Sequence, residues 1–149
     1  MRAVVQRVSS ASVSVAAETV ASIGQGLLVL LGAAKGDLQA DADWMAVKIA
    51  GLRIFENDGG KLNRDVVQVQ GSVLMVSNFT VCGTAQKGRR PSFDEAASFE
   101  DGRRLFVSCV DRLRLNGLTI ETGSYGADMA VSLVNVGPVT LILESRRMD

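Results

Sequence analysis

A long strand-like run near the C-terminus, residues 131–143, is the feature that most constrains how this chain can fold. The run is rich in β-branched and aliphatic residues, a composition typical of a β-strand. Gly137 and Pro138 interrupt it at its middle. Proline has no N–H group for a sheet ladder and glycine has no side chain to pack, so we expect a bulge or sharp corner there. The break is either a kink in an edge strand or a corner that presents main-chain groups to a ligand.

Length and charge limit the class of protein. A chain of 149 residues that is 47% hydrophobic can bury one ordinary core, so we expect a single domain over residues 1–149. Sixteen basic and sixteen acidic residues cancel, so a nucleic acid could be held only by a local basic patch. No apolar run approaches the ~20 residues of a membrane span, and the N-terminus has no signal-peptide pattern. We therefore expect a cytosolic protein with no membrane partner.

The absence of histidine is the main chemical constraint. It excludes Ser-His-Asp and Cys-His nucleophile systems and argues against a zinc site. Cys82 and Cys109 have no metal-ligand spacing, and a cytosolic location argues against a disulfide between them. We expect no metal and no other cofactor. An enzyme with this composition must use a carboxylate, a lysine, a tyrosine or a group of the substrate as its base.

The remaining periodicity predicts an α+β domain with a mainly antiparallel, barrel-like sheet and two principal helices. We expect Trp44 to anchor the core and Gly51 to end the first helix in a left-handed cap. The second helix carries one stripe of residues 99, 103, 106, 110 and 113. Strand patterns lie at 3–8, 12–15, 19–23, 26–33, 52–55, 72–81, 118–121 and 129–143, and helical patterns at 39–50 and 99–116.

Two polar stretches are candidates for function. Ser77, Asn78 and Thr80 end the apolar run 72–81, where they either satisfy nearby backbone groups or form the wall of a small site. Thr80 is a weak nucleophile here, because the chain has no histidine and the residue is not N-terminal. A second stretch holds Lys87, Arg89 and Arg90, which form either a solvated loop or a set of phosphate contacts.

Several motifs occur together in one order along the chain. They are Met1-Arg2-Ala3-Val4-Val5-Gln6-Arg7-Val8, residues 26–32, Leu52-Arg53-Ile54-Phe55, Lys87-Gly88-Arg89-Arg90-Pro91-Ser92-Phe93, Gly126-Ala127-Asp128-Met129 and Asn135-Val136-Gly137-Pro138-Val139-Thr140. With these motifs the chain resembles, across nearly its whole length, D-aminoacyl-tRNA deacylase (the D-tyrosyl-tRNA deacylase family). The resemblance implies a homodimer whose active site is completed across the subunits. It also implies hydrolysis of the ester between tRNA and a D-amino acid, or glycine mischarged on tRNA(Ala), with rejection of L-aminoacyl substrates.

The resemblance assigns a role to the corner in the C-terminal run. It implies that the Gly137–Pro138 bond is cis and enters the site of the partner subunit, where its carbonyl groups exclude an L side chain. Arg7 is similar to the family arginine that supports this corner. Lys87, Arg89 and Arg90 are then expected to contact tRNA phosphates.

The resemblance also assigns the residues of the reaction centre. Ser77, Asn78, Phe79 and Thr80 correspond to a catalytic Ser-Gln-Phe-Thr wall, with Asn78 one methylene shorter than the usual glutamine. Tyr125 and Met129 match positions near the pocket for the terminal adenosine. The family is thought to use backbone atoms and the ribose 2′-hydroxyl of the substrate, so the lack of histidine is expected.

Two alternatives stay open. A related deacylase that removes a small L-amino acid from mischarged tRNA would need a trans bond at Gly137–Pro138. A non-catalytic RNA-binding module on the same fold would be favoured by a broad basic surface and by loss of the Gly-Pro corner. The corner is present in this sequence and the net charge is zero.

Overall fold

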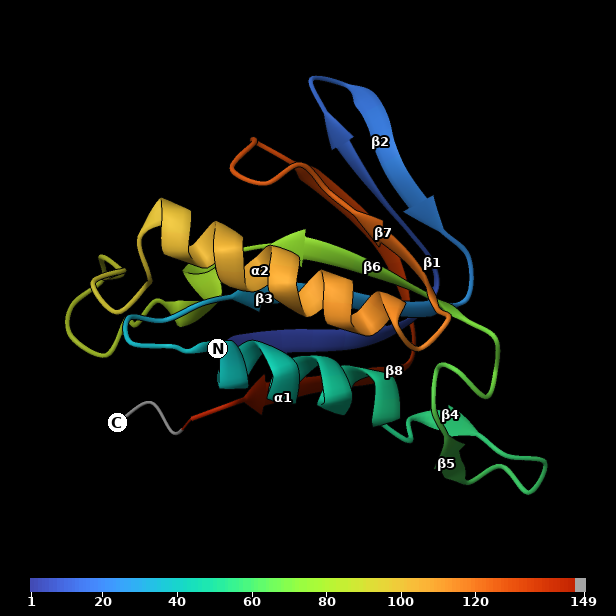
Figure 1. The fold of residues 1–149 in the computed structure, drawn as a ribbon. Coiled ribbons are helices and arrows are strands. Elements are labelled where there is room, and N and C mark those ends of the chain that lie inside the picture. The colour runs from blue at the N-terminus through green and yellow to red at the C-terminus, as the bar shows by residue number, and fades with distance from the viewer. Residues whose placement is uncertain (147–149) are drawn as a thin grey trace.

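Strand β1 (Arg2–Val15) organises the sheet because it pairs with three other strands (Figure 1). The structure, a computed structural model, describes residues 1–146. Strand β3 (Gly26–Gly32) runs antiparallel to the first half of β1, and β2 (Glu18–Ile23) runs antiparallel to its last part. Strand β8 (Ala130–Glu144) pairs with β1 along nearly its whole length, so the C-terminal run is a strand as predicted.

Two further strands extend the sheet in parallel. Strand β6 (Ser72–Ser77) pairs with β3, and β7 (Thr119–Thr122) pairs with β6. The sheet is mixed and nearly closed, and its antiparallel pairings all involve β1. With the two helices it forms one α+β domain, which confirms the predicted barrel-like class. Strands β4 (Phe55–Glu56) and β5 (Leu62–Arg64) form a separate small ribbon.

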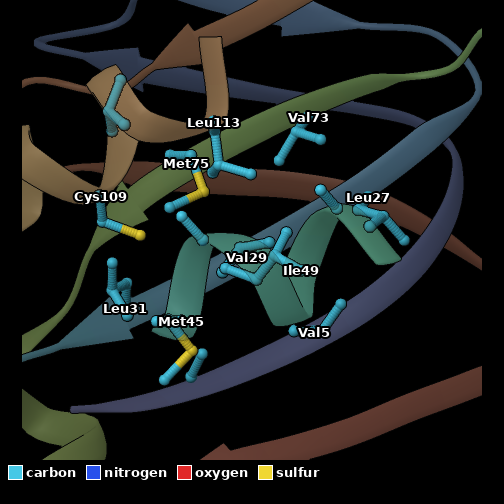
Figure 2. Close-up of a cluster of buried hydrophobic side chains, with 14 of the residues drawn as sticks. Val5, Leu27, Val29, Leu31, Met45, Ile49, Val73, Met75, Cys109 and Leu113 are labelled. Carbon is cyan, nitrogen blue, oxygen red and sulfur yellow. The ribbon is translucent and has the colours of Figure 1, made fainter. Parts of the chain in front are cut away.

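Helices α1 (Gln39–Gly51) and α2 (Phe99–Arg114) pack against each other and cover one face of the sheet (Figure 1). Successive side chains of a strand point to opposite faces, so alternate residues of β3 enter this helix-covered core while Leu28 joins a second buried cluster. Burial on both faces explains the unbroken apolar run of β3. Figure 2 labels ten side chains of the helix-covered core, which are Val5, Leu27, Val29, Leu31, Met45, Ile49, Val73, Met75, Cys109 and Leu113.

Two expectations about α1 were wrong. Trp44 is not a core anchor: its side chain is exposed, and the Lys48 amino group lies 5.6 Å from its ring centroid. The helix presents Met45 and Ile49 to the core, which directs the adjoining position 44 outward. Gly51 is the last residue of α1 and is not left-handed, because the chain leaves the helix through Leu52 in an extended conformation.

Parts of the sheet and of α2 also differ from the prediction, and the patterns at 3–8 and 12–15 belong to the single strand β1. Only Phe55 of the expected strand at 52–55 is in a strand, and β6 stops at Ser77 rather than continuing to residue 81. On α2 the later part of the predicted stripe is buried, but Phe99 and Arg103 are exposed. The first turn of α2 lies against the loop 123–129 and not against the sheet, so its side chains have no core to enter.

Within residues 1–146, none of the helices has both the length and the apolar character that crossing a membrane requires.

Candidate active site

A cavity of about 440 Å³ opens at the ends of β3 and β6, between the 3₁₀ helix η1 (Phe79–Cys82), the first turn of α2 and the loop 123–129. The parallel pairing of β3 with β6 places η1 at one edge of the sheet, beside the start of α2. The cavity thus unites residues from distant parts of the sequence. Of the predicted site residues it brings together Ser77, Asn78, Phe79, Thr80, Tyr125 and Met129.

Asn78 determines the shape of the wall formed by residues 77–80. Its backbone is extended, and its side-chain Oδ1 accepts hydrogen bonds from the Thr80 N–H group at 3.2 Å and from the Thr80 hydroxyl group at 2.5 Å. It is therefore the N-cap of η1. The Gly83 N–H group donates to the Thr80 carbonyl oxygen at 2.9 Å and closes the other end of the turn. These contacts fix the backbone at the cavity wall without a catalytic base.

The Thr80 hydroxyl group is not arranged as a nucleophile. Its proton is donated to an amide oxygen, which is not a base that could remove it. The side chain is exposed at the mouth of the cavity, and Phe79 beside it is also exposed. What this wall can offer a substrate is a set of oriented main-chain and amide groups.

Tyr125 fixes the opposite side of the cavity. Its hydroxyl group donates to the Phe99 carbonyl oxygen at 3.1 Å, and its ring meets the Phe99 ring edge to face at a centroid distance of 5.0 Å. A Cβ atom at Gly102 would lie 2.6 Å from this hydroxyl oxygen, so a larger residue there would displace the end of the Tyr125 side chain. Burial raises the pKa of Tyr125, and the charge of Arg103 opposes that effect. Tyr125 therefore remains a neutral hydrogen-bond donor at physiological pH.

Met129 lies beside Tyr125 on the loop that precedes β8. Its sulfur atom is 2.7 Å from the place where a Cβ atom of Gly123 would be, so that glycine makes room for it. Sequence reasoning missed the contributions of Phe99 and Gly102 to this cavity. Both lie in a helix whose periodicity resembles that of a core helix, and no local signal marks where that helix passes the edge of the sheet.

The predicted corner at Gly137–Pro138 does not line this cavity. Its peptide bond is cis, as expected, and both residues are exposed. β8 continues through the corner, and its register with β1 shifts there. The corner is therefore an irregularity in a strand and also a protruding piece of backbone.

Side chains hold the corner from both sides. The Arg7 guanidinium donates to the Val136 carbonyl oxygen at 3.1 Å and to the Ile54 carbonyl oxygen at 2.9 Å. Asn135 Oδ1 accepts from the Val139 N–H group at 3.0 Å. Gly137 has a φ of 124°, and a Cβ atom there would lie 2.9 Å from the Arg7 guanidinium. Arg7 is therefore bonded to the backbone beside the corner, and its role as the support of the corner stays a prediction.

The cationic residues Lys87, Arg89 and Arg90 lie on an exposed loop outside the cavity. Paired backbone hydrogen bonds of 2.9 and 2.8 Å between Thr84 and Ser92 close the base of this loop. The loop projects from the end of the molecule at which α2 begins (Figure 1). Its charges are therefore at the same end of the domain as the cavity mouth.

Thiol and metal chemistry find no support in the described part of the chain. No group of three or more Asp, Glu or Cys side chains within residues 1–146 is placed to hold a metal ion. Cys82 and Cys109 are both buried. Burial raises the pKa of the Cys82 thiol and raises that of Cys109 to about 12. Neither sulfur is a thiolate at neutral pH.

Comparison with known proteins identifies the family. The model of the family described as D-Tyr-tRNA(Tyr) deacylase matches residues 4–144. A D-aminoacyl-tRNA deacylase of Geobacter sulfurreducens is 56% identical over 98% of this chain and 96% of its own length. A D-aminoacyl-tRNA deacylase of Thermotoga petrophila is 50% identical over 99% of each chain.

Solved structures have the same fold. One titled "c-Myc DNA Unwinding Element Binding Protein" superposes with a TM-score of 0.92 at 40% identity, over 99% of this chain and all of its own. A probable eukaryotic D-amino acid tRNA deacylase superposes with a TM-score of 0.80 at 14% identity, over 95% of this chain and 97% of its own, and shows the fold alone. The family match over residues 4–144 and the identity with curated relatives along almost the entire chain show that this protein belongs to the D-Tyr-tRNA(Tyr) deacylase family.

Proposed function

We propose that this enzyme hydrolyses the ester bond of D-aminoacyl-tRNA and of glycyl-tRNA mischarged on tRNA(Ala), giving the free amino acid and tRNA, and that it rejects L-aminoacyl-tRNA. The observation that carries the proposal is the meeting of the 77–80 wall with Tyr125 and Met129 in one cavity. Its volume of about 440 Å³ suits a small-molecule group such as an aminoacylated adenosine. The cytosol is the compartment in which we propose that the enzyme acts.

The reaction we propose uses no nucleophilic side chain. The ester carbonyl lies against the wall, where the Phe79 N–H group and the Asn78 side-chain NH2 group stabilise the negative charge on its oxygen. Neither group donates a hydrogen bond within residues 1–146, whereas the Asn78, Thr80 and Val81 N–H groups do. Water adds to the carbonyl carbon, and the bond to the ribose oxygen then breaks. The neighbouring 2′-hydroxyl group of the substrate assists transfer of a proton from this water to the departing ribose oxygen. Positioning and charge stabilisation suffice because an aminoacyl ester is already reactive.

Selectivity is supplied by a second copy of the chain. The Gly137–Pro138 corner is exposed and lies outside the cavity of its own chain, so it acts, in this proposal, in the cavity of a partner. β8 also exposes apolar side chains, with Val134 53% and Ile142 66% accessible, and a homodimer contact there would cover them. The corner carbonyl groups accept a bond from the substrate amino group and occupy the volume of an L side chain.

Exclusion of this kind has a specific consequence for glycine. A steric block rejects a competitor by clash and does not depend on loss of a favourable contact. Glycine has no side chain to clash, so glycyl-tRNA remains a substrate. A filter based on a pocket that recognises a D side chain would instead reject glycine.

The test is the hydrolysis of matched D-, L- and glycyl-tRNA by the purified dimer. We expect rapid release of D-amino acid and glycine and none of the L-amino acid above the spontaneous rate. Release of a small L-amino acid in preference to its D form would establish the L-specific alternative. Resistance of glycyl-tRNA would remove exclusion as the basis of selectivity.

Nucleic-acid binding without hydrolysis is the competing function. A protein with this fold and 40% identity is titled as a DNA-element binding protein. Binding of deacylated tRNA together with no hydrolysis of any aminoacyl-tRNA would favour a binding module. The cavity favours catalysis, since binding to a nucleic-acid backbone needs charged surface and no enclosed space.

A further inference from the structure

An aromatic ring stands exposed at the mouth of the cavity. Phe99, the first residue of α2, is 61% accessible although it lines the cavity. The Tyr125 ring meets it at 5.0 Å and an interplanar angle of 73°. A Cβ atom at Gly126 would lie 2.6 Å from the Phe99 ring, so glycine at that position allows the ring to pack against the loop. Phe99 is therefore held in place on one side and open on the other.

A cation lies one helical turn beyond this ring. Residues four apart on a helix share a face, with Cβ atoms about 5–6 Å apart, so Arg103 follows Phe99 along the surface of α2. Both line a shallow groove that adjoins the cavity at Phe99, which lines the two. Arg104 in the same groove is 3.6 Å from Asp101, whereas Arg103 has no carboxylate within ion-pair distance among residues 1–146. The positive charge of Arg103 is close enough to Tyr125, at the cavity rim, to oppose the rise in the Tyr125 pKa that burial causes.

This arrangement fits a single-stranded nucleotide. Unpaired bases are bound by stacking on aromatic side chains, and their phosphates by arginine or lysine. The distance between Phe99 and Arg103 is one that the base and phosphate of one nucleotide can span. The groove begins where the cavity ends, so a chain whose terminal adenosine fills the cavity would pass along it.

We propose that Phe99 and Arg103 form a subsite for the nucleotide that precedes the terminal adenosine of the tRNA, with its base stacked on Phe99 and the adjoining phosphate bound by Arg103. The inference rests on the proposed function, since it assumes that the cavity holds the aminoacylated end. Glu100 also lines the groove and repels a phosphate. The attraction between Arg103 and the phosphate must therefore exceed this repulsion. The subsite adds substrate affinity and takes no part in bond cleavage.

The experiment compares two small esters that differ by this one nucleotide. They are 3′-O-D-aminoacyl-adenosine and the same ester of the dinucleotide cytidylyl-adenosine, each assayed for kcat/KM with the native enzyme. We expect the dinucleotide ester to be favoured by roughly tenfold, in line with one stacked base. The Phe99→Ala variant should reduce that ratio to near one, and Phe99→Trp should restore it.

The proposed contact between Arg103 and the phosphate is tested by measuring how the preference for the dinucleotide ester depends on salt concentration. Substitution of Arg103 by glutamine should lower the salt dependence of the dinucleotide's advantage by about 0.7 log-log units, the share of one phosphate contact on a single strand. Arg103→Lys should retain it. The matched controls lie at the other end of α2. Arg114→Gln removes the same charge about 16 Å along the helix axis from Arg103, and Leu115→Ala, at the C-cap, removes an exposed apolar side chain about 24 Å from Phe99. Both controls should leave the ratio of the two esters unchanged.

The outcomes separate this subsite from the proposed function. If native enzyme hydrolyses both esters equally well, or if Phe99→Ala keeps the full preference for the dinucleotide, the subsite is wrong while the deacylase function stands. If the variant loses activity equally on both esters, Phe99 only shapes the cavity and the subsite is again wrong. If neither the esters nor D-aminoacyl-tRNA is hydrolysed, the proposed function fails and this inference fails with it.

Discussion

The turn at Asn78 and the corner at Gly137–Pro138 are both main-chain features held by a polar side chain, yet they lie in opposite surroundings. The turn faces a cavity and is fixed from within by its own Asn78 cap. The corner protrudes into solvent and is fixed from behind by Arg7. In a single chain, the wall at residues 77–80 thus lies apart from the corner that is proposed to select the substrate. This separation favours an arrangement in which the corner of one copy acts at the cavity of another.

The largest effect is expected from preventing the two copies from meeting. Ile142→Arg places a charge on the exposed apolar face of β8, and we expect a folded monomer by size-exclusion chromatography and circular dichroism. Without a partner's corner to complete the site, kcat/KM on D-aminoacyl-tRNA should fall by about 100-fold. Leu62→Arg, an equally apolar exposed position on β5, is the matched control and should remain dimeric. A monomer that keeps full D-selectivity would disprove a corner supplied in trans.

The next effect concerns the turn. Asn78→Ala removes the cap of η1 and an amide at the cavity wall, and we expect kcat to fall roughly 10- to 100-fold, the range for a lost cap or oxyanion donor. Because binding of tRNA elsewhere is untouched, KM should change little.

Thr80→Ala is the control for the turn, since its hydroxyl group contacts only Asn78 among residues 1–146. It should retain activity within about tenfold. A loss of several orders of magnitude, with fold and tRNA binding intact, would return Thr80 to a direct role in the chemistry.

A smaller effect should follow from loosening the corner. Arg7→Lys keeps the charge but cannot reach both the Val136 and Ile54 carbonyl oxygens in the same fork geometry. We expect the ratio of D- to L-aminoacyl-tRNA hydrolysis to fall roughly tenfold, the range for one charge-assisted hydrogen bond. This ratio is the decisive measurement. If hydrolysis of D-aminoacyl-tRNA changes while the ratio does not, Arg7 stabilises the fold and does not contribute to selectivity.

The cationic loop belongs neither to the turn at Asn78 nor to the corner at Gly137–Pro138. Substitutions in it should therefore change the affinity for tRNA alone. Replacing Lys87, Arg89 and Arg90 by glutamine should weaken tRNA binding several-fold at low salt. It should also reduce the slope of log Kd against log salt by about 0.7–0.9 for each lost contact. Selectivity and kcat should be preserved. An unchanged salt slope would show that the loop is only solvated surface.

The smallest effect is expected from thiol reagents. Cys82 ends the turn, but burial raises its pKa, and the pKa of Cys109 is about 12, so both thiols stay protonated at pH 8. Iodoacetamide should label the native enzyme slowly, without loss of activity, and label both cysteines once the protein is unfolded. Rapid inactivation traced to Cys82 by mass spectrometry would contradict this picture of the turn.

Part of the molecule follows from sequence alone because the relevant physics is local. The strands and helices follow from hydrophobic periodicity, which backbone geometry imposes on any segment that has one buried face. The corner follows from the chemistry of glycine and proline. The assignments of Arg7 to the corner and of residues 77–80 to a catalytic wall came from motifs shared with a family. Arg7 bonds the Val136 carbonyl oxygen and residues 77–80 line the cavity, while their roles stay predictions.

Only the tertiary structure decided which faces those segments turn to one another. Trp44 was expected in the core and Phe99 begins the stripe of the second helix, yet both are exposed, because burial depends on what packs across from a side chain. Gly51 could have ended its helix in a left-handed cap, but Leu52 leaves it in an extended conformation. The cavity exists because parallel pairing of β3 with β6 brings residues 77–80 to the start of α2. Strand pairing is a non-local choice, and for that reason no local pattern could have located the site.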